Sequence, residues 1–257
     1  MSLVIEHNHR VLHLTLNRPD KRNALDRDLC ARLVEAITSV QSHAGTGAVL
    51  ISATGQVFSA GMDLDEAVQP GSQELAQVHE ELFTLGAHSM KPIIISVNGS
   101  ALGGGLGLVA QGHVVLAAES AVFGLTEIRV GLWPFLVYRS VEAALGPRRM
   151  LELSLTGRVF PAAKALDWGL VHHLCHTSEL ADRAAAIARD IANASPAATK
   201  AGMNYVRDAR GKSWTEAGEL ATKLRQELMD HGDFREGVAA FKEKRQPHWP
   251  SMHAHKK

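Results

Sequence analysis

The first two-thirds of the chain alternates between two spacings of hydrophobic residues. Leu12, Leu14 and Leu16 alternate with polar neighbours, which is the period of a half-buried strand. From Leu25 to Val40 apolar residues recur at helical spacing, and Asp26 stands where an N-cap would begin that helix. Three short apolar runs further predict buried strands: residues 48–53, 93–99 and 113–118. Strands that alternate with helices are typical of an α/β fold.

From Ser178 onward the pattern is helical throughout. Four consecutive segments have helical spacing, and no strand signal lies among them. The boundary falls near Ser195 and Pro196, so we expect an α/β core over residues 1–195 and a helical region over residues 196–257. Leu220, Leu224 and Leu228 lie four residues apart, on one apolar face of a predicted helix.

The segment from Asn98 to Gly112, "NGSALGGGLGLVAQG", is unusual in its glycines. Gly103, Gly104 and Gly105 stand in a row, and each glycine weakens a strand or helix by about 1 kcal/mol relative to alanine. A dinucleotide fingerprint would need a further glycine where Leu108 stands, and a P-loop would need a lysine that this segment lacks. The segment therefore indicates either a tight packing of helix on strand or a close approach of a ligand to the backbone.

A helix that begins at about Leu106 would follow this turn. The first N–H groups of a helix have no partner within it and lie at the positive end of its dipole. Without a Cβ at Gly104, a ligand oxygen could reach that N–H. This geometry suits an oxyanion, and removing one donor to an oxyanion costs about 3–4 kcal/mol.

Composition limits the classes of function. The 257 residues include 27 basic and 27 acidic side chains, and this balance disfavours nucleic acid and membrane surfaces as partners. Cys30 and Cys175 are far apart and form no metal or redox motif, so we expect reduced, buried thiols in a soluble cytoplasmic protein. The histidines around Cys175, at positions 172, 173 and 176, fit no structural zinc spacing. We expect no metal site.

Six segments in order resemble the signature segments of the crotonase (enoyl-CoA hydratase/isomerase) superfamily: "NRPDKRNAL", "FSAGMDL", "NGSALGGG", "FGLTEIRVGL", "LTGRVFPAAKALDWGLV" and "EGVAAFKEKRQP". The resemblance covers residues 10–247. It implies an α/β spiral of ββα units, followed by a C-terminal helical region that packs into trimers or hexamers. It also implies an acyl-CoA thioester substrate and no cofactor besides the coenzyme A of that substrate.

The resemblance assigns roles to individual residues. The N–H groups of Met62 and Gly104 match the family's oxyanion hole for the thioester carbonyl, and Glu127 matches a catalytic carboxylate. Family hydratases carry another glutamate two residues past the glycine triplet, where this chain has Gly107. Asp63 matches a family aspartate that more often caps a helix. Other acids close in sequence could take the missing role: Asp63, Asp65, Glu80 and Glu81.

The resemblance also places the substrate. Coenzyme A is expected along the "KRNAL" turn and the "SAGMDL" loop, with Arg22 as a phosphate ligand or a solvated cation. Trp133, Phe135 and Tyr138 would line an acyl pocket or pack in the core. The full set of residues expected to bind coenzyme A or substrate is Arg22, Ala24, Ala60, Gly61, Asp63, Leu64 and Leu132.

One carboxylate suffices for moving a double bond, whereas hydration is easier with two. The sequence therefore favours isomerisation or hydration of an enoyl-CoA with a single glutamate, and isomerisation over hydration. The alternatives are a decarboxylase, a thioester hydrolase, or a catalytically weak acyl-CoA-binding protein. The acyl chain that is processed stays open.

Overall fold

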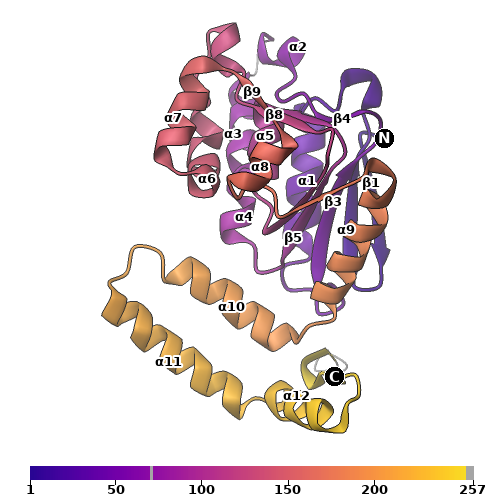
Figure 1. Ribbon diagram of the computed structural model, residues 1–257, viewed down its shortest axis with the longest axis vertical. Helices are drawn as coiled ribbons and strands as arrows, with labels where there is room; N and C mark the ends of the chain where they lie inside the picture. Colours follow the sequence, from indigo (N-terminus) through magenta and orange to yellow (C-terminus); the bar gives the residue numbers. More distant parts are fainter. Residues whose placement is uncertain (70–71, 253–257) are drawn as a thin grey trace.

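Two β-sheets form the centre of the computed structural model, which describes residues 1–69 and 72–252 (Figure 1). The larger sheet has six strands in the order β1-β2-β3-β5-β7-β10. Only the β1–β2 pair in it is antiparallel, and the other four pairs are parallel. Its strands are β1 (Leu3–Asn8), β2 (Val11–Leu16), β3 (Ala48–Ala53), β5 (Ile93–Val97), β7 (Val114–Ala118) and β10 (His173–Cys175).

The smaller sheet has four short strands in the order β4-β6-β8-β9. They are β4 (Val57–Ser59), β6 (Ser100–Leu102), β8 (Val122–Gly124) and β9 (Val159–Pro161). Three times in succession the chain passes from a strand of the large sheet to one of the small sheet and then into a helix. These are the repeated ββα units of the predicted spiral, and each unit delivers the residues after its short strand to the same side of the molecule.

The strands in the middle of the large sheet have apolar side chains on both faces of the sheet. Helices cover both faces and bury these side chains. On one face, Leu14, Ile51 and Ile95 pack in a core that includes α1 (Arg27–Ser39). On the other face, Leu50, Ile94 and Leu116 pack against α9 (Thr177–Ala192). The elements that accompany the small sheet are α2 (Leu64–Ala67), α3 (Ser72–Leu82), α4 (Leu85–His88), α5 (Gly104–Val109), α6 (Phe135–Leu145), α7 (Pro147–Thr156), α8 (Ala162–Asp167) and the 3-10 turns η1 (Pro19–Lys21) and η2 (Glu127–Val130). Of these elements, α5 and α8 contact the small sheet.

Three helices, α10 (Pro196–Asp208), α11 (Trp214–Asp230) and α12 (Gly232–Glu243), form a separate layer below the sheets, with the short turn η3 (Pro250–Met252) beside α12 (Figure 1). No residue of α10 or α11 is buried. Ser195 caps α10 and accepts the Ala198 N–H. Large apolar side chains stay exposed in this layer, among them Val206, Trp214 and Phe241.

The predicted strands over β2, β3, β5 and β7 and the four predicted C-terminal helices are all present. Strand β1 and the small sheet are additions to the prediction. Their short strands carry little periodic signal, and they form because parallel and antiparallel neighbours complete their hydrogen bonds. Among the described residues, no helix is long and apolar enough to cross a membrane.

Candidate functional site

The glycine-rich turn joins β6 to α5. Gly103 has a positive φ of 53°, a conformation that favours glycine, and its N–H donates to the Gly124 carbonyl of β8 at 2.8 Å. Helix α5 then begins at Gly104, so the predicted start at Leu106 was two residues late. The Gly107 N–H donates to the Gly103 carbonyl at 3.1 Å and closes the first turn. Glycines have low helix propensity, which explains why the sequence pattern missed this first turn.

The loop before α2 lies directly against this helix start. A Cβ on Gly61 would come within 3.1 Å of the Gly104 nitrogen, and a Cβ on Gly104 would lie 3.5 Å from the Met62 nitrogen. The backbone N–H groups of Met62 and Gly104 are therefore neighbours, although 42 residues separate them. Within the part of the chain that the structure describes, neither N–H donates a hydrogen bond. Two adjacent unpaired donors at a helix N-terminus form a site for an anionic oxygen.

The turn after η1 holds the Met62 loop in place. Asn23 is fully buried with a φ of 51°, and its side-chain amide donates to the carbonyls of Thr54 and Val57 at 2.9 and 2.8 Å. Its own carbonyl accepts the Ser59 hydroxyl at 2.8 Å. That hydroxyl oxygen in turn accepts the Gly61 N–H at 3.2 Å. Each buried polar group has a partner, so the loop is rigid up to the residue before Met62.

Glu127 opens η2, just after β8, and its carboxyl faces the glycine turn. A Cβ on Gly103 would lie 3.3 Å from Oε1, which is why this position excludes side chains. Oε2 is buried and has no hydrogen-bond partner among the described residues. Burial raises the pKa of the carboxyl, and only its own backbone N–H opposes that shift. A buried carboxyl with a raised pKa and an unpaired oxygen is what proton transfer near neutral pH requires.

Glu127 and the two N–H groups open into one cavity of about 360 Å³. Its size is near the lower end of the range for small-molecule sites. The lining comes from the Met62 loop, α2, α3, the glycine turn, η2 and the segment that leads into α6. Among the residues that line it, the only polar side chains are His79, Thr126 and Glu127, and Glu127 is the only carboxylate. Of the expected substrate-binding residues, four line this cavity: Ala60, Gly61, Leu64 and Leu132.

The side of the cavity that faces Gly107 is apolar. A Cβ on Gly107 would lie 2.1 Å from Cγ1 of Val137 and 3.2 Å from Cε1 of Phe83. Both of these side chains are buried, and both line the cavity. Helix α6 thus packs so closely on α5 that Val137 occupies the space a longer side chain at position 107 would need. Gly107 is a packing glycine, and neither of the two side chains that lie against it can donate a proton.

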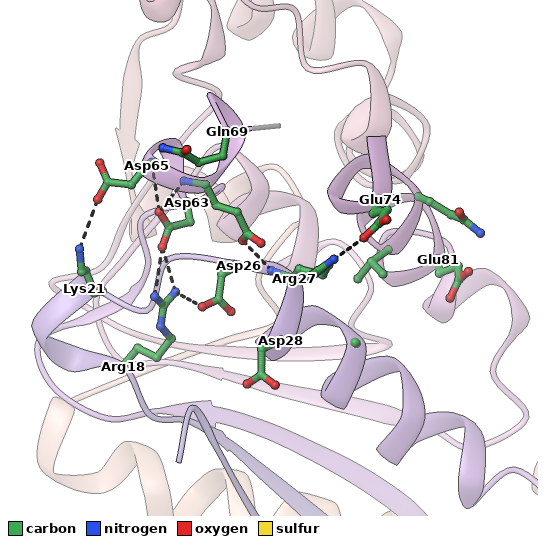
Figure 2. A pocket seen from close by; sticks show the side chains of 14 residues that line it. Arg18, Lys21, Asp26, Arg27, Asp28, Asp63, Asp65, Gln69, Glu74 and Glu81 are labelled. Carbon is green, nitrogen blue, oxygen red and sulfur yellow. Dashed lines mark hydrogen bonds and ion pairs between the residues drawn. The ribbon is translucent and has the colours of Figure 1, made fainter. Parts of the chain in front are cut away.

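The other acids weighed for the missing role lie outside the cavity. Asp63, Asp65 and Glu81 line a separate, charged pocket of about 860 Å³ (Figure 2), and Glu80 is exposed. Asp63 accepts the Asp65 and Glu66 N–H groups and so caps α2. Arg18 donates to Asp63 at 3.1 Å through both of its terminal nitrogens. Asp63 therefore fixes the chain directly after Met62, and it lines the charged pocket and not the cavity of Glu127.

The Arg18 guanidinium binds two carboxylates of that charged pocket. Figure 2 shows it between Asp63 and Asp26, with the Asp26 carboxylate at 3.0 Å. It also donates to the Ala24 carbonyl at 2.6 Å. Arg22 is exposed; its carbonyl accepts the Ala60 N–H at 2.9 Å, and its guanidinium donates no hydrogen bond among the described residues. Arg22, Ala24 and Asp63 thus lie beside the Met62 loop and outside the cavity.

The aromatic residues before and within α6 divide into two groups. Trp133 and Phe135 line the cavity, and Phe135 is 72% exposed at its rim. Tyr138 stacks on Trp133 with ring centroids 6.5 Å apart and does not line the cavity. Trp133 therefore has one face toward the cavity wall and a partner that holds its orientation.

The histidines near Cys175 belong to the large sheet. His173 and Cys175 are in β10, and His172 Nδ1 accepts the Val115 N–H at 3.0 Å. Cys30 and Cys175 are buried, and burial raises the pKa of both thiols. No group of three or more potential metal ligands occurs among residues 1–69 and 72–252.

Sequence reasoning missed His79 as a residue of this cavity. His79 is 3% exposed and lies on the inner face of α3 with Leu75 and Leu82. The available signal was a histidine at a core position, four residues after one leucine and three before another. That pattern marks burial but does not show that the side chain reaches a cavity.

Comparisons with known proteins identify the family of the chain. The model of the family described as enoyl-CoA hydratase/isomerase matches residues 6–252. Mevalonyl-coenzyme A hydratase sidH of Aspergillus fumigatus is 33% identical over 253 residues, covering 93% of this chain and 91% of its own. The mitochondrial Delta(3,5)-Delta(2,4)-dienoyl-CoA isomerase of Rattus norvegicus is 29% identical over 252 residues, covering 91% of this chain and 77% of its own.

Solved structures are similar over nearly the whole chain. An enoyl-CoA hydratase of Mycobacterium smegmatis has a TM-score of 0.91 at 28% identity, covering 97% of this chain and 99% of its own. Human enoyl coenzyme A hydratase domain-containing protein 3 has a TM-score of 0.91 at 26% identity, covering 97% and 100%. The α/β arrangement expected from the sequence is therefore confirmed.

Proposed function

The chain belongs to the enoyl-CoA hydratase/isomerase family, and we propose that it moves a double bond in an acyl-CoA thioester with Glu127 as its one proton carrier. The observation that carries this proposal is the contrast between the two walls of the cavity. Glu127 lines the cavity with an oxygen that has no partner among the described residues, whereas Val137 fills the space beside Gly107.

The thioester carbonyl binds between the N–H groups of Met62 and Gly104. Removing a proton next to a thioester gives an enolate, whose negative charge lies on that oxygen. Two fixed donors stabilise this charge without having to reorganise during the reaction, and each contributes about 3–4 kcal/mol. The unpaired state of both N–H groups and their closeness support this role.

Glu127 takes the proton and returns it. In a 3-enoyl thioester, the carboxylate removes a proton from C2, and the electron pair delocalises into the carbonyl oxygen. The same carboxylic acid then protonates C4, which leaves a 2-enoyl thioester with no net change in protons or electrons. A base of this kind contributes about 10²- to 10⁴-fold to the rate.

Hydration of a 2-enoyl thioester makes a different demand. Water must be activated at C3 while a proton reaches C2, and two acids divide these tasks more easily than one. Relatives named for hydration and for isomerisation resemble this chain about equally. The apolar wall formed by Val137 and Phe83 favours isomerisation, because it offers no group to orient water.

The coenzyme A portion leaves the cavity along the Met62 loop. Arg22 is exposed beside that loop, and its guanidinium suits a phosphate. Coenzyme A binds along the backbone at Ala24 and Ala60. The hydrogen bond between Arg18 and Asp63 holds this stretch of backbone in place. We place the acyl chain among Leu64, Leu132 and Trp133.

The C-terminal helices support assembly of three or six copies. Leu224 and Leu228 line an apolar groove with Tyr205 and Phe234, and α10 and α11 bury none of their residues within one chain. Sedimentation at micromolar concentration should therefore give a trimer or hexamer. A stable monomer would contradict this assembly.

The reaction itself is tested with a panel of 3-enoyl-CoA and 2-enoyl-CoA thioesters. Absorbance of the conjugated thioester should rise with 3-enoyl substrates and fall only slowly with 2-enoyl substrates in water. Hydration of crotonyl-CoA that equals the fastest isomerisation would exclude the proposal. Binding without turnover would identify an acyl-CoA-binding protein, and release of free coenzyme A or carbon dioxide would identify a hydrolase or decarboxylase.

A further inference from the structure

We infer that His79 is a positioning residue that fixes the Met62 half of the oxyanion hole through the carbonyl of Leu25. This inference rests on the proposed function, because it assigns a task within the same hole. His79 is 3% exposed and reaches the cavity from α3. Its Nε2 lies 3.2 Å from the Leu25 oxygen. A carbonyl oxygen only accepts, so Nε2 carries the proton and donates it.

Leu25 connects both halves of the hole. Its N–H donates to the Gly61 carbonyl at 2.8 Å, and its carbonyl accepts the Asp63 N–H at 3.2 Å. These two bonds hold the residues on either side of Met62, and Leu25 and Met62 form a parallel β-bridge. The Leu25 side chain reaches the other half, because its Cδ1 would lie 3.4 Å from a Cβ on Gly104. The position of Leu25 therefore sets the distance between the two donors.

His79 supplies the second hydrogen bond to this carbonyl. A carbonyl has two lone pairs, and the Asp63 N–H uses one of them. Without His79 the other lone pair of the Leu25 carbonyl would be buried and unpaired. The Leu25–Met62 bridge would also lose its hydrogen bond to α3. Leu25 is fully buried, so bulk solvent does not reach its carbonyl oxygen.

The ring of His79 is held in turn by Phe83. Their ring centroids are 5.5 Å apart, with Phe83 in the turn directly after α3, and Phe83 Cζ would lie 3.2 Å from a Cβ on Gly104. Helix α3 and the residue that follows it thus contact both halves of the hole, His79 through Leu25 and Phe83 through Gly104. Burial lowers the pKa of His79 and so favours the neutral ring, which still has the Nε2–H that the Leu25 carbonyl needs.

Two variants separate the donor from the ring. His79→Phe keeps an aromatic ring and removes the donor, and His79→Gln keeps a donor without the ring. We expect His79→Phe to lower kcat about tenfold to a hundredfold with KM nearly unchanged, because a small misplacement of a catalytic donor has that cost. His79→Gln should recover most of the loss.

A spectroscopic measurement excludes a merely structural role. Butyryl-CoA carries the thioester carbonyl but has no double bond to move. Its carbonyl stretch, followed by isotope-edited infrared spectroscopy, should move to lower frequency on binding to the parent protein. In His79→Phe that shift should shrink, and in His79→Gln it should return.

His113 provides a matched control. It also joins two backbone groups, accepting the Ile93 N–H at 2.9 Å and contacting the Gly86 carbonyl at 3.0 Å, but it does not line the cavity. His113→Phe should lower the melting temperature and leave the carbonyl shift unchanged. A full carbonyl shift in His79→Phe, or an equal loss of shift in His113→Phe, would overturn the inference.

The parent protein gives a test that needs no variant to fold. With histidine labelled at nitrogen, the Nε2 proton of His79 should be protected from exchange and should change its chemical shift when butyryl-CoA binds. A proton that exchanges freely, or whose chemical shift stays the same when butyryl-CoA binds, contradicts the inference. If the parent itself produces no carbonyl shift with butyryl-CoA, the proposed oxyanion hole fails first and this inference fails with it.

Discussion

The wall of the cavity that carries Glu127 and the wall that carries Gly107 come from consecutive units of the same spiral. Each follows a short strand of the small sheet, β8 for Glu127 and β6 for Gly107. The first wall presents a buried carboxyl whose Oε2 has no partner among the described residues. At the second, a neighbouring helix is so close that Val137 takes the space a side chain would use. Two consecutive units of the spiral thus place a buried carboxyl after one short strand and a tightly packed glycine after the other.

The N–H groups of Met62 and Gly104 belong to the backbone of the Met62 loop and the glycine turn, and neither needs a side chain at position 107. Beside Gly107, α6 packs closely on α5 through Val137. The following experiments test the two walls separately.

The largest effect should come from Glu127→Gln. Glutamine keeps the shape of the side chain but cannot take a proton, so kcat should fall about 10²- to 10⁴-fold. Binding of butyryl-CoA should change little. Glu81→Gln, an acid of the neighbouring charged pocket, is the matched control and should remain fully active. Equal activity of the Glu127→Gln variant and the parent would remove Glu127 from the mechanism.

Gly104→Ala should have the next largest effect. The added methyl would lie 3.5 Å from the Met62 nitrogen, where the thioester oxygen is expected, while its contacts with Phe83 and Leu25 at 3.2 and 3.4 Å need only small shifts. The rate should fall about 10²- to 10³-fold, as for loss of one oxyanion donor. Gly202→Ala in α10, where nothing lies within 4 Å, should leave activity unchanged. A folded, fully active Gly104→Ala protein would contradict the assignment.

On the second wall, Gly107→Ala should change stability. Its methyl would overlap Val137, and overpacking of this kind costs about 1–3 kcal/mol in the free energy of unfolding. Val137→Ala should relieve that strain, so the double variant should be more stable than the sum of the two single changes predicts. Denaturant melts of the four proteins measure this coupling. Strictly additive effects would mean that the two residues do not share the space.

Double variants at positions 107 and 137 also test which reaction the protein catalyses. Gly107→Glu combined with Val137→Gly places a second carboxylate opposite Glu127 and removes the overlap. If the missing acid limits hydration, this double variant should hydrate crotonyl-CoA faster than Val137→Gly alone, while isomerisation changes less. Unchanged hydration in a folded double variant would show that the second wall is not what limits it.

The smallest effect concerns pH and stability. The pKa of Glu127 is raised in the folded protein, so the folded state holds this proton more tightly than the unfolded chain. The stabilisation that the Glu127 proton gives the folded state is complete below the ordinary carboxyl pKa. It is lost as the pH rises through the raised pKa of Glu127. Glu127→Gln should therefore raise the melting temperature relative to the parent near neutral pH, and the difference should shrink in acid. Thermal melts across pH check the sign.

Much of the fold followed from local patterns. Strands β2, β3, β5 and β7 of the large sheet and helix α1 bury continuous or periodic apolar residues, so the local sequence encodes their positions. The short strands of the small sheet were not predicted, because three residues carry too little pattern. These strands form because strands from different units of the spiral pair with each other, as β6 and β8 do at Ala101 and Phe123.

By itself the sequence determined the family, through six ordered segments, and it determined the chemical elements of the site. A glycine triplet, a glutamate and the absence of a second acid can all be read without coordinates. Only the tertiary structure decided that Val137 fills the place beside Gly107, that Asp63 and Glu81 face another pocket, and that His79 reaches Leu25. These facts depend on contacts between segments 30 to 54 residues apart, and such distances are fixed by packing, which no local pattern encodes.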